Sequence, residues 1–296
     1  AAAVNPVDAF VRSGTYRTPV PMPLIVGRDL VGTVTGTGSG ARGFGLGDRV
    51  WCNSMGHEGR QGTTAQFASV PAERLYRLPD GTHPETAVAV AQPAATAYLG
   101  WFVHGGLQPG RTVFVGGGAG NIGSAAIAMA ALAGARVIAS AHPNDHARCR
   151  AAGADTVLDY RDPHLPDRLT EHAPQGIEVY WETSGHHDFA AVDQVAAAGC
   201  RVLVTASAPD TPPVPLPHLY TRDVTLPGFV ISRASATDLA DAASLINHML
   251  ARGLLTAQIA DRLPLAQTAE AHRRIEEGQV KGRLLITVHY RSGTRP

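Results

Sequence analysis

From Val113 to Ser124 the chain reads VFVGGGAGNIGS. An apolar run typical of a buried strand breaks into glycines, and an alanine-rich segment typical of a buried helix follows at 125–135. In this setting Gly118-x-Gly120-x-x-Gly123 indicates a dinucleotide-binding turn, because a tight turn lets the backbone approach a pyrophosphate and the helix start offers unpaired N–H groups. A plain turn, or the similar turn of an S-adenosylmethionine-dependent methyltransferase, is the alternative. We expect the dinucleotide to contact Gly118, Ala119, Gly120, Asn121, Ile122 and Gly123.

The end of the second expected strand, 136–140, bears on the choice between NAD and NADP. An acidic residue about 20 positions beyond the first motif glycine usually bonds the ribose 2′-hydroxyl of NAD. Here the chain reads Ser140-Ala141-His142-Pro143-Asn144, without an acid. A carboxylate would repel a 2′-phosphate, so its absence favours NADP. Donors could come from His142, Asn144, His146 and Arg148, which fit the solvated first turn of a surface helix equally well.

Composition excludes several classes of protein. The 296 residues are 44% hydrophobic and 17% charged, which suits one large domain or two ordinary ones with a substantial core. Lys+Arg and Asp+Glu balance at 25 each, so no nucleic-acid partner is expected. The only lysine, Lys281, precedes Gly282, which excludes a P-loop. The isolated cysteines, an absent signal-peptide pattern and the lack of a membrane-length apolar run predict a cytoplasmic protein without a membrane partner.

Two kinds of pattern alternate along the chain. Short apolar runs between Gly/Pro turns, including 24–37 and 65–71, predict a partly open β-barrel. Helices are expected at 84–90 and 94–104. Strands then alternate with helices, which predicts a doubly wound parallel sheet. We expect these strands at 111–115, 136–140, 156–159, 177–182, 199–205 and 224–231, and a last strand at 283–288 that rejoins the barrel.

Neither a zinc site nor an esterase nucleophile is expected from the motifs of the chain. Gly56-His57-Glu58-Gly59 matches a ligand motif of zinc alcohol dehydrogenases, but no cysteine stands where a partner ligand is needed, so no metal is expected. The chain also contains no Gly-x-Ser-x-Gly, which leaves an esterase without a nucleophile.

The serial order of the motifs resembles a known family. It runs through Asn5-Pro6-Val7-Asp8, Gly27-x-Asp29-x-x-Gly32, Gly47-Asp48-Arg49-Val50, Thr96-Ala97-Tyr98, the glycine turn and Gly282-Arg283-Leu284-Leu285. This order is similar to that of the quinone oxidoreductase branch, which includes zeta-crystallin, of the medium-chain dehydrogenase/reductase family. Members of the branch carry a longer segment before the position of Asn5.

The resemblance implies a fold and an activity. It implies an α/β protein: a GroES-like catalytic domain, 1–91 and 229–296, joined to a Rossmann NADP-binding domain, 92–228. It also implies NADPH as hydride donor, no zinc, a homodimer, and a quinone or an activated alkene such as an enone as substrate. The alternative within the same fold is an NADPH-binding structural or RNA-binding protein with little catalysis, as lens crystallins are.

The resemblance also assigns residues. Asn5 and Arg28 stand where zinc relatives keep a cysteine and a histidine ligand, so they should face the nicotinamide with Tyr16 nearby. Arg28 is larger than expected there, and an ordinary ion pair with Asp29 or with a nearby carboxylate is the alternative. Phe10 replaces a tyrosine that contacts the cofactor. The remaining expected cofactor contacts are Thr96, Ser140, His142, Arg148, Tyr160, Ser184, Gly185, Thr205, Ala206, Ser207, Phe229, Val230 and Ile231.

Overall fold

The computed structural model describes residues 1–206 and 212–288 and divides the chain into two compact units. One unit, called here the N/C unit, contains residues 1–95 and 235–296. The other, the central unit, contains residues 96–234. The boundaries expected from the sequence, after residues 91 and 228, stay a prediction.

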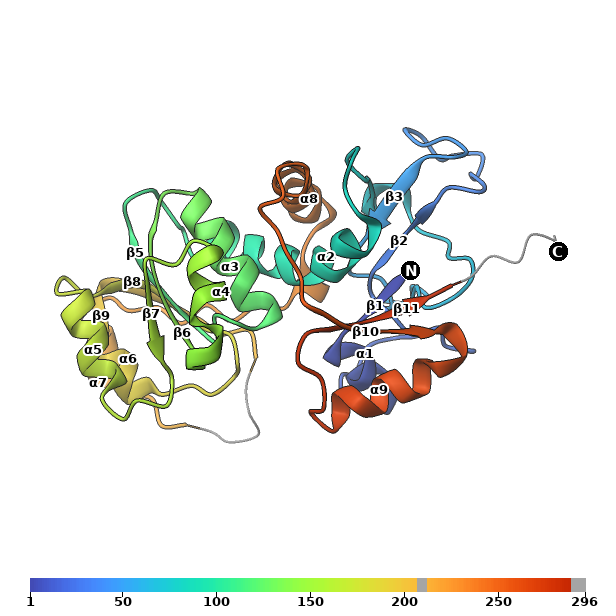
Figure 1. Ribbon diagram of the computed structural model, residues 1–296. Helices are drawn as coiled ribbons and strands as arrows, with labels where there is room; N and C mark the ends of the chain where they lie inside the picture. Colours follow the sequence, from blue (N-terminus) through green and yellow to red (C-terminus); the bar gives the residue numbers. More distant parts are fainter. Residues whose placement is uncertain (207–211, 289–296) are drawn as a thin grey trace. The chain divides into compact units, whose positions relative to one another are not determined.

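The central unit is built on a parallel sheet with strand order β7-β6-β5-β8-β9 (Figure 1). The strands are β5 Thr112–Gly116, β6 Arg136–Ala141, β7 Thr156–Asp159, β8 Ile177–Glu182 and β9 Ala196–Leu203. The chain builds outward from β5 to β7 and then returns to β8 on the other side of β5, so the order reverses there, as in a doubly wound fold. The connecting helices are α3 Asn121–Leu132, α4 His146–Ala151, α5 Leu165–His172, α6 Phe189–Val195 and α7 Leu216–Tyr220.

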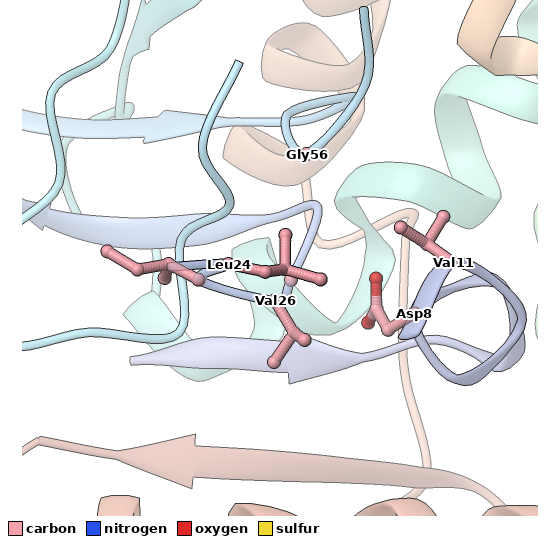
Figure 2. A pocket seen from close by; sticks show the side chains of 7 residues that line it. Asp8, Val11, Leu24, Val26 and Gly56 are labelled. Atoms are coloured by element: carbon pink, nitrogen blue, oxygen red, sulfur yellow. The ribbon is translucent and has the colours of Figure 1, made fainter. Parts of the chain in front are cut away.

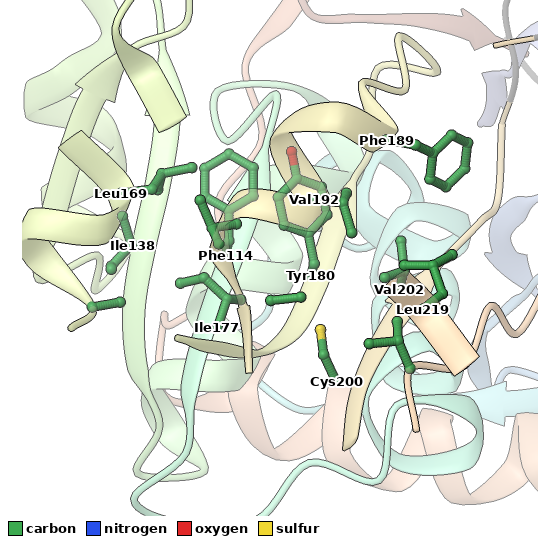
Figure 3. Packing of buried hydrophobic residues seen from close by; sticks show 14 residues of the cluster. Phe114, Ile138, Leu169, Ile177, Tyr180, Phe189, Val192, Cys200, Val202 and Leu219 are labelled. Carbon is green, nitrogen blue, oxygen red and sulfur yellow. The ribbon is translucent and has the colours of Figure 1, made fainter. Parts of the chain in front are cut away.

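One core of the central unit lies between this sheet and the helices α5, α6 and α7. Phe114, Ile138, Tyr180, Cys200 and Val202 from the strands are buried in it. Leu169, Val192 and Leu219 come from the helices, as Figure 3 shows. Because both faces of a parallel sheet are covered, its strands are almost continuously apolar. These apolar runs are why the strands could be predicted from the sequence.

Two expected elements of the central unit differ from the structure. The segment 224–231 forms only single bridges, from Thr225 to Arg201 of β9 and from Gly228 to Val204 just after β9, rather than a strand. Pro227 lies between these bridges and has no N–H to donate to a ladder. The two helices expected at 84–90 and 94–104 are one helix, α2 Pro84–Tyr98, which continues as a π-helical segment, Leu99–His104.

The N/C unit contains two small sheets with the orders β1-β11-β10 and β2-β3-β4. Their strands are β1 Ala2–Val4, β2 Leu30–Thr33, β3 Arg49–Cys52, β4 Leu75–Arg77, β10 Ile259–Pro264 and β11 Arg283–Thr287. The helices are α1 Pro6–Ser13, α8 Ala236–Ala251 and α9 Thr268–Glu276. The Val31 N–H donates to the Ala1 carbonyl (2.9 Å), which joins β2 to the start of β1. The strand expected at 24–37 is only β2, and 65–71 is not a strand.

Candidate functional site

The glycine turn of the central unit joins β5 to α3. Gly117 has φ +66°, which favours glycine, and a Cβ on Gly123 would lie 2.2 Å from the Gly117 oxygen. A Cβ on Gly118 would meet Ile127 at 3.0 Å. Gly120 differs, because its Cβ would approach only the Gly117 oxygen, at 3.1 Å. Among the motif glycines, Gly123 is therefore required by the fold, whereas at Gly120, beside the helix start, a single atom lies near the added Cβ.

The start of α3 suits an anion. Its N-cap is Gly120, and no side chain caps it. The first N–H groups of a helix have no partner within the helix and carry the positive end of its dipole. The phosphates of a dinucleotide are the ligands that such a glycine-lined helix start accepts.

The residues expected to select NADP lie beside this turn. The Ser140 carbonyl accepts from the Gly118 N–H (2.8 Å), so the end of β6 holds the turn through its backbone. Arg148 Nη2 donates to the Ala119 oxygen (2.6 Å) and lies 3.5 Å from Asp145. His142 Nδ1 accepts from the Asn144 N–H at the turn before α4. The structure therefore brings a guanidinium into contact with the glycine turn.

The other expected cofactor residues of the central unit gather where strands end. Tyr160 follows β7, Ser184 and Gly185 follow β8, and Thr205 and Ala206 follow β9. The Thr205 hydroxyl accepts from the Trp181 indole (3.1 Å), and the Ala206 oxygen contacts His187 Nε2 (2.6 Å). Ligands of open α/β sheets bind at these carboxyl ends.

Six expected residues do not directly follow a strand of this sheet or lie outside the described residues. Thr96 is buried in α2. Phe229 stacks on His104, with ring centroids 4.4 Å apart, and is followed by Val230 and Ile231. Ser207 lies outside the described residues. Phe10 lies on α1 of the N/C unit and is half exposed. A residue that the sequence analysis did not identify is Thr183, whose hydroxyl donates to the Gly116 oxygen (2.7 Å) at the β8 strand end.

In the N/C unit, two loops pack side by side and form a polar cluster. Residues 18–28 pair with residues 55–64 through backbone bonds such as Gly62 N–H to the Ile25 oxygen and Met55 N–H to the Arg28 oxygen (2.9 and 3.0 Å). Gly27 has φ +103°, and its Cβ would lie 2.3 Å from the Thr64 hydroxyl, so only glycine fits the pairing. This pairing places His57 beside the segment that carries Arg28.

Tyr16, Arg28 and His57 meet in this cluster. The Arg28 guanidinium carbon lies 5.9 Å from the centre of the Tyr16 ring, a cation–π arrangement. The His57 ring centroid lies 5.9 Å from that of Tyr16, and His57 Nδ1 is hydrogen-bonded to the Thr18 hydroxyl (2.9 Å). Arg28 is only 1% exposed, and burial lowers its pKa, while Asp8 opposes that shift.

Asn5 lies in a second, buried part of the cluster. Its Nδ2 donates to Asp29 Oδ2 and its Oδ1 accepts from Arg283 Nη2, both at 2.9 Å. Arg283 also lies 3.6 Å from Asp29. The charges of Asp8 and Asp29 both oppose the lowering of the Arg28 pKa, so an ion pair of Arg28 with Asp29 or a nearby carboxylate stays the alternative to a catalytic role. Neither Arg283 nor its pairing with Asp29 was assigned a role from the sequence.

Asp8 is the acid at the start of α1. Its Oδ2 accepts from the Asn5 N–H (2.8 Å), half of a capping box. Figure 2 shows its carboxyl group beside Val11, Leu24, Val26 and Gly56, which line a small hollow. Burial raises the pKa of Asp8 to about 6, and burial likewise raises the pKa of Asp29 to about 7.

The described residues contain no group of three or more His, Cys, Asp or Glu side chains that could hold a metal ion. His57 Nε2 lies 3.7 Å from Glu58 Oε1, but His57 is bonded to Thr18 and Glu58 points to solvent. No helix in the described part of the chain combines the length and apolar character needed to cross a membrane.

Two family models match the chain. The alcohol dehydrogenase GroES-like domain matches residues 1–80, and the zinc-binding dehydrogenase model matches residues 121–248. The human quinone oxidoreductase is 25% identical over 289 residues, which cover 97% of this chain and 86% of the relative.

Solved structures are similar over nearly the whole chain. A structure described as an NAD-dependent alcohol dehydrogenase is 28% identical with a TM-score of 0.86, and covers 97% of this chain and 90% of its own. A mycobacterial protein complexed with NADPH is 26% identical with a TM-score of 0.81, at 97% and 89% coverage.

Proposed function

The chain belongs to the medium-chain dehydrogenase/reductase family, and we propose that it is a zinc-independent, NADPH-dependent oxidoreductase. The proposed hydride acceptor is a quinone or the β-carbon of an activated alkene such as an enone. The observation that carries the proposal is the glycine turn, where at Gly120, beside an uncapped helix start, a single atom lies near an added Cβ. Two dehydrogenase models leave the methyltransferase alternative without support.

The residues of the central unit fit NADPH. The turn Gly118–Gly123 would hold the pyrophosphate, and Ser140, His142 and Arg148 lie at the side where the adenosine ribose of a doubly wound fold binds. Arg148 supplies the positive charge that a 2′-phosphate needs, and the neighbouring Asp145 is paired with it. When bound, the cofactor supplies the hydride.

The residues of the N/C unit would stabilise the charge on the substrate. Hydride addition places negative charge on a carbonyl or quinone oxygen, so a donor fixed in advance gains more in the transition state than in the ground state. We assign this role to Arg28, Tyr16 and Asn5. The buried Arg28 has lost its hydration, which strengthens its attraction for a developing oxyanion. Asn5 contributes its side-chain amide, whose Nδ2 lies 2.9 Å from Asp29 Oδ2.

The experiment is an NADPH oxidation assay with a panel of simple quinones and enones, followed by the absorbance of reduced nicotinamide. Turnover with at least one class supports the proposal and names the acceptor. Saturable NADPH binding without turnover of either class would instead favour a structural or RNA-binding protein of the same fold. The balanced charge of the chain argues against the RNA alternative. The homodimer is part of the proposal and is measured by light scattering.

A further inference from the structure

The buried contact between Asn5 and Arg283 gives a role to a residue that the proposed function leaves unused. Arg283 is the first residue of β11 and is 3% exposed. The antiparallel register pairs Ala3 with Leu285 and Val4 with Leu284, so the next residue on each strand brings Asn5 beside Arg283. The backbone at Arg283 is fixed as well, since its N–H donates to the Gln258 oxygen (2.7 Å).

The hydrogen bonds determine which way the Asn5 amide points. A guanidinium donates but cannot accept, so the atom that faces Arg283 must be Oδ1. Nδ2 then faces the Asp29 carboxylate at 2.9 Å. An amide is planar and carries two N–H bonds, so holding its oxygen and one N–H fixes the direction of the second N–H. Without Arg283 the amide could turn over or leave the plane.

We propose that Arg283 is the positioning residue of the active site: it fixes the Asn5 amide so that the second N–H is aimed at the substrate oxygen. The inference rests on the proposed function, because it assumes that Asn5 contacts the substrate. In this role Arg283 acts through Asn5, with which it is hydrogen-bonded. Its charge also balances Asp29, which together with Asp8 would otherwise leave buried negative charge beside the developing oxyanion.

A double-mutant cycle tests the proposal. Arg283→Lys keeps the charge but loses the guanidinium fork, and Asn5→Ala removes the amide. Loss of one preorganised donor costs about a hundredfold or more in kcat. Arg283→Lys should misplace the donor without removing it, so kcat should fall by about tenfold or more. The KM for NADPH should stay unchanged. In the Asn5→Ala background the same substitution should cost nothing further. Equal losses in both backgrounds would show that Arg283 acts independently of Asn5 and would overturn the proposal.

Arg262→Met is the matched control, since it removes an arginine from the neighbouring strand β10, where Arg262 pairs with Glu85 at the surface. It should leave kcat unchanged. A loss of melting temperature in Arg283→Lys with an unchanged kcat would make Arg283 merely structural and would also refute the proposal.

A readout that needs no turnover separates this inference from the proposed function. The two side-chain N–H signals of Asn5, assigned by their disappearance in Asn5→Ala, are observed by NMR. In the wild-type protein their exchange with solvent should be slow, and Arg283→Lys should accelerate it while Arg262→Met does not. If no acceptor is reduced, the proposed function fails, yet this measurement still decides whether Arg283 holds the amide; unchanged exchange in Arg283→Lys shows that it does not.

Discussion

At the scale of the residue, the unusual feature is a guanidinium buried among a tyrosine, a histidine and two acids. Burial of a charge is unfavourable unless nearby groups compensate for it. The face of the Tyr16 ring lies near the Arg28 guanidinium, and the negative charge of Asp8 favours the charged form of Arg28. Asp29 lies 3.6 Å from Arg283, and its charge also opposes the lowering of the Arg28 pKa.

Arg28→Met, which keeps most of the volume, tests the assignment of Arg28 to the substrate. Turnover should fall by about a hundredfold, or about 2.7 kcal/mol, because the charge that stabilises the oxyanion is lost. NADPH affinity and melting temperature should barely change. Acidic or strongly polarised acceptors should lose more than neutral ones, since a buried guanidinium favours an anion. Retained turnover with a lowered melting temperature would mean that Arg28 is structural.

Asp8 should make the stability of the fold depend on pH. Its pKa is raised to about 6 from the ordinary 3.8, so between these values the folded state holds a proton that the unfolded state has released. The stability from this group is complete below the lower value and is lost as the pH rises through about 6. Asp8→Asn keeps an acceptor but cannot ionise.

The measurement is urea unfolding of both proteins across this pH range. Relative to Asp8→Asn, the wild-type protein should lose up to about 1.4 kcal/mol for each pH unit. Comparing the two proteins at each pH cancels the other titrating groups. A constant difference at every pH would show that the Asp8 pKa is not raised.

At the scale of the element, different glycines of the β5–α3 turn serve the packing of the fold and the binding of the cofactor. Gly123 allows the helix to pack near the strand, whereas a Cβ on Gly120 would approach only the Gly117 oxygen, at 3.1 Å. The three glycines of one motif therefore have different physical roles, although the sequence pattern treats them alike.

Substitutions at these two glycines should have opposite signatures. Gly123→Ala forces a Cβ against the Gly117 oxygen and should destabilise the fold by about 1–3 kcal/mol, measured by thermal unfolding. Gly120→Leu should lower the melting temperature less than Gly123→Ala does but weaken NADPH binding at least about a hundredfold, because the side chain occupies pyrophosphate space. Gly38→Ala, where no heavy atom lies within 4 Å, is the control. Full NADPH affinity in Gly120→Leu would place the pyrophosphate elsewhere.

At the scale of the whole molecule, the arrangement of charges bears on cofactor choice. Arg148 contacts the glycine turn, and the strand β6 ends at Ala141 without an acid. We expect NADPH to bind at least about tenfold more tightly than NADH, or about 1.4 kcal/mol, because a 2′-phosphate meets a cation and no unpaired carboxylate. Titration of both nucleotides measures this ratio, and equal affinity would contradict it. Measuring both nucleotides is informative because a similar solved structure is described as an NAD-dependent alcohol dehydrogenase.

Turnover should also be independent of metal. The resemblance to zinc-containing relatives implies that Asn5 and Arg28 stand at the positions of two zinc ligands, and neither side chain binds zinc well. Prolonged treatment with a chelator should therefore leave kcat unchanged. Activity that is lost on chelation and restored by zinc would point back to His57 and Glu58.

The sequence by itself determined the family and the fold, which are confirmed. The reason is that their signals are local. The glycine spacing specifies a tight turn between a strand and a helix, and apolar strands alternating with helices specify a parallel sheet. Local signals failed where a proline or a neighbouring segment intervened, as at Pro227 in the segment 224–231 and along the single helix α2.

Only the tertiary structure determined which polar groups meet. Asn5 and Arg283 are hydrogen-bonded although 278 positions separate them, and His57 reaches Tyr16 through the pairing of two loops. No spacing in the sequence encodes these contacts, because they depend on strand register and on loops that close over one another. For the same reason no spacing in the sequence shows that Asp29 lies 3.6 Å from Arg283, a residue of the last strand.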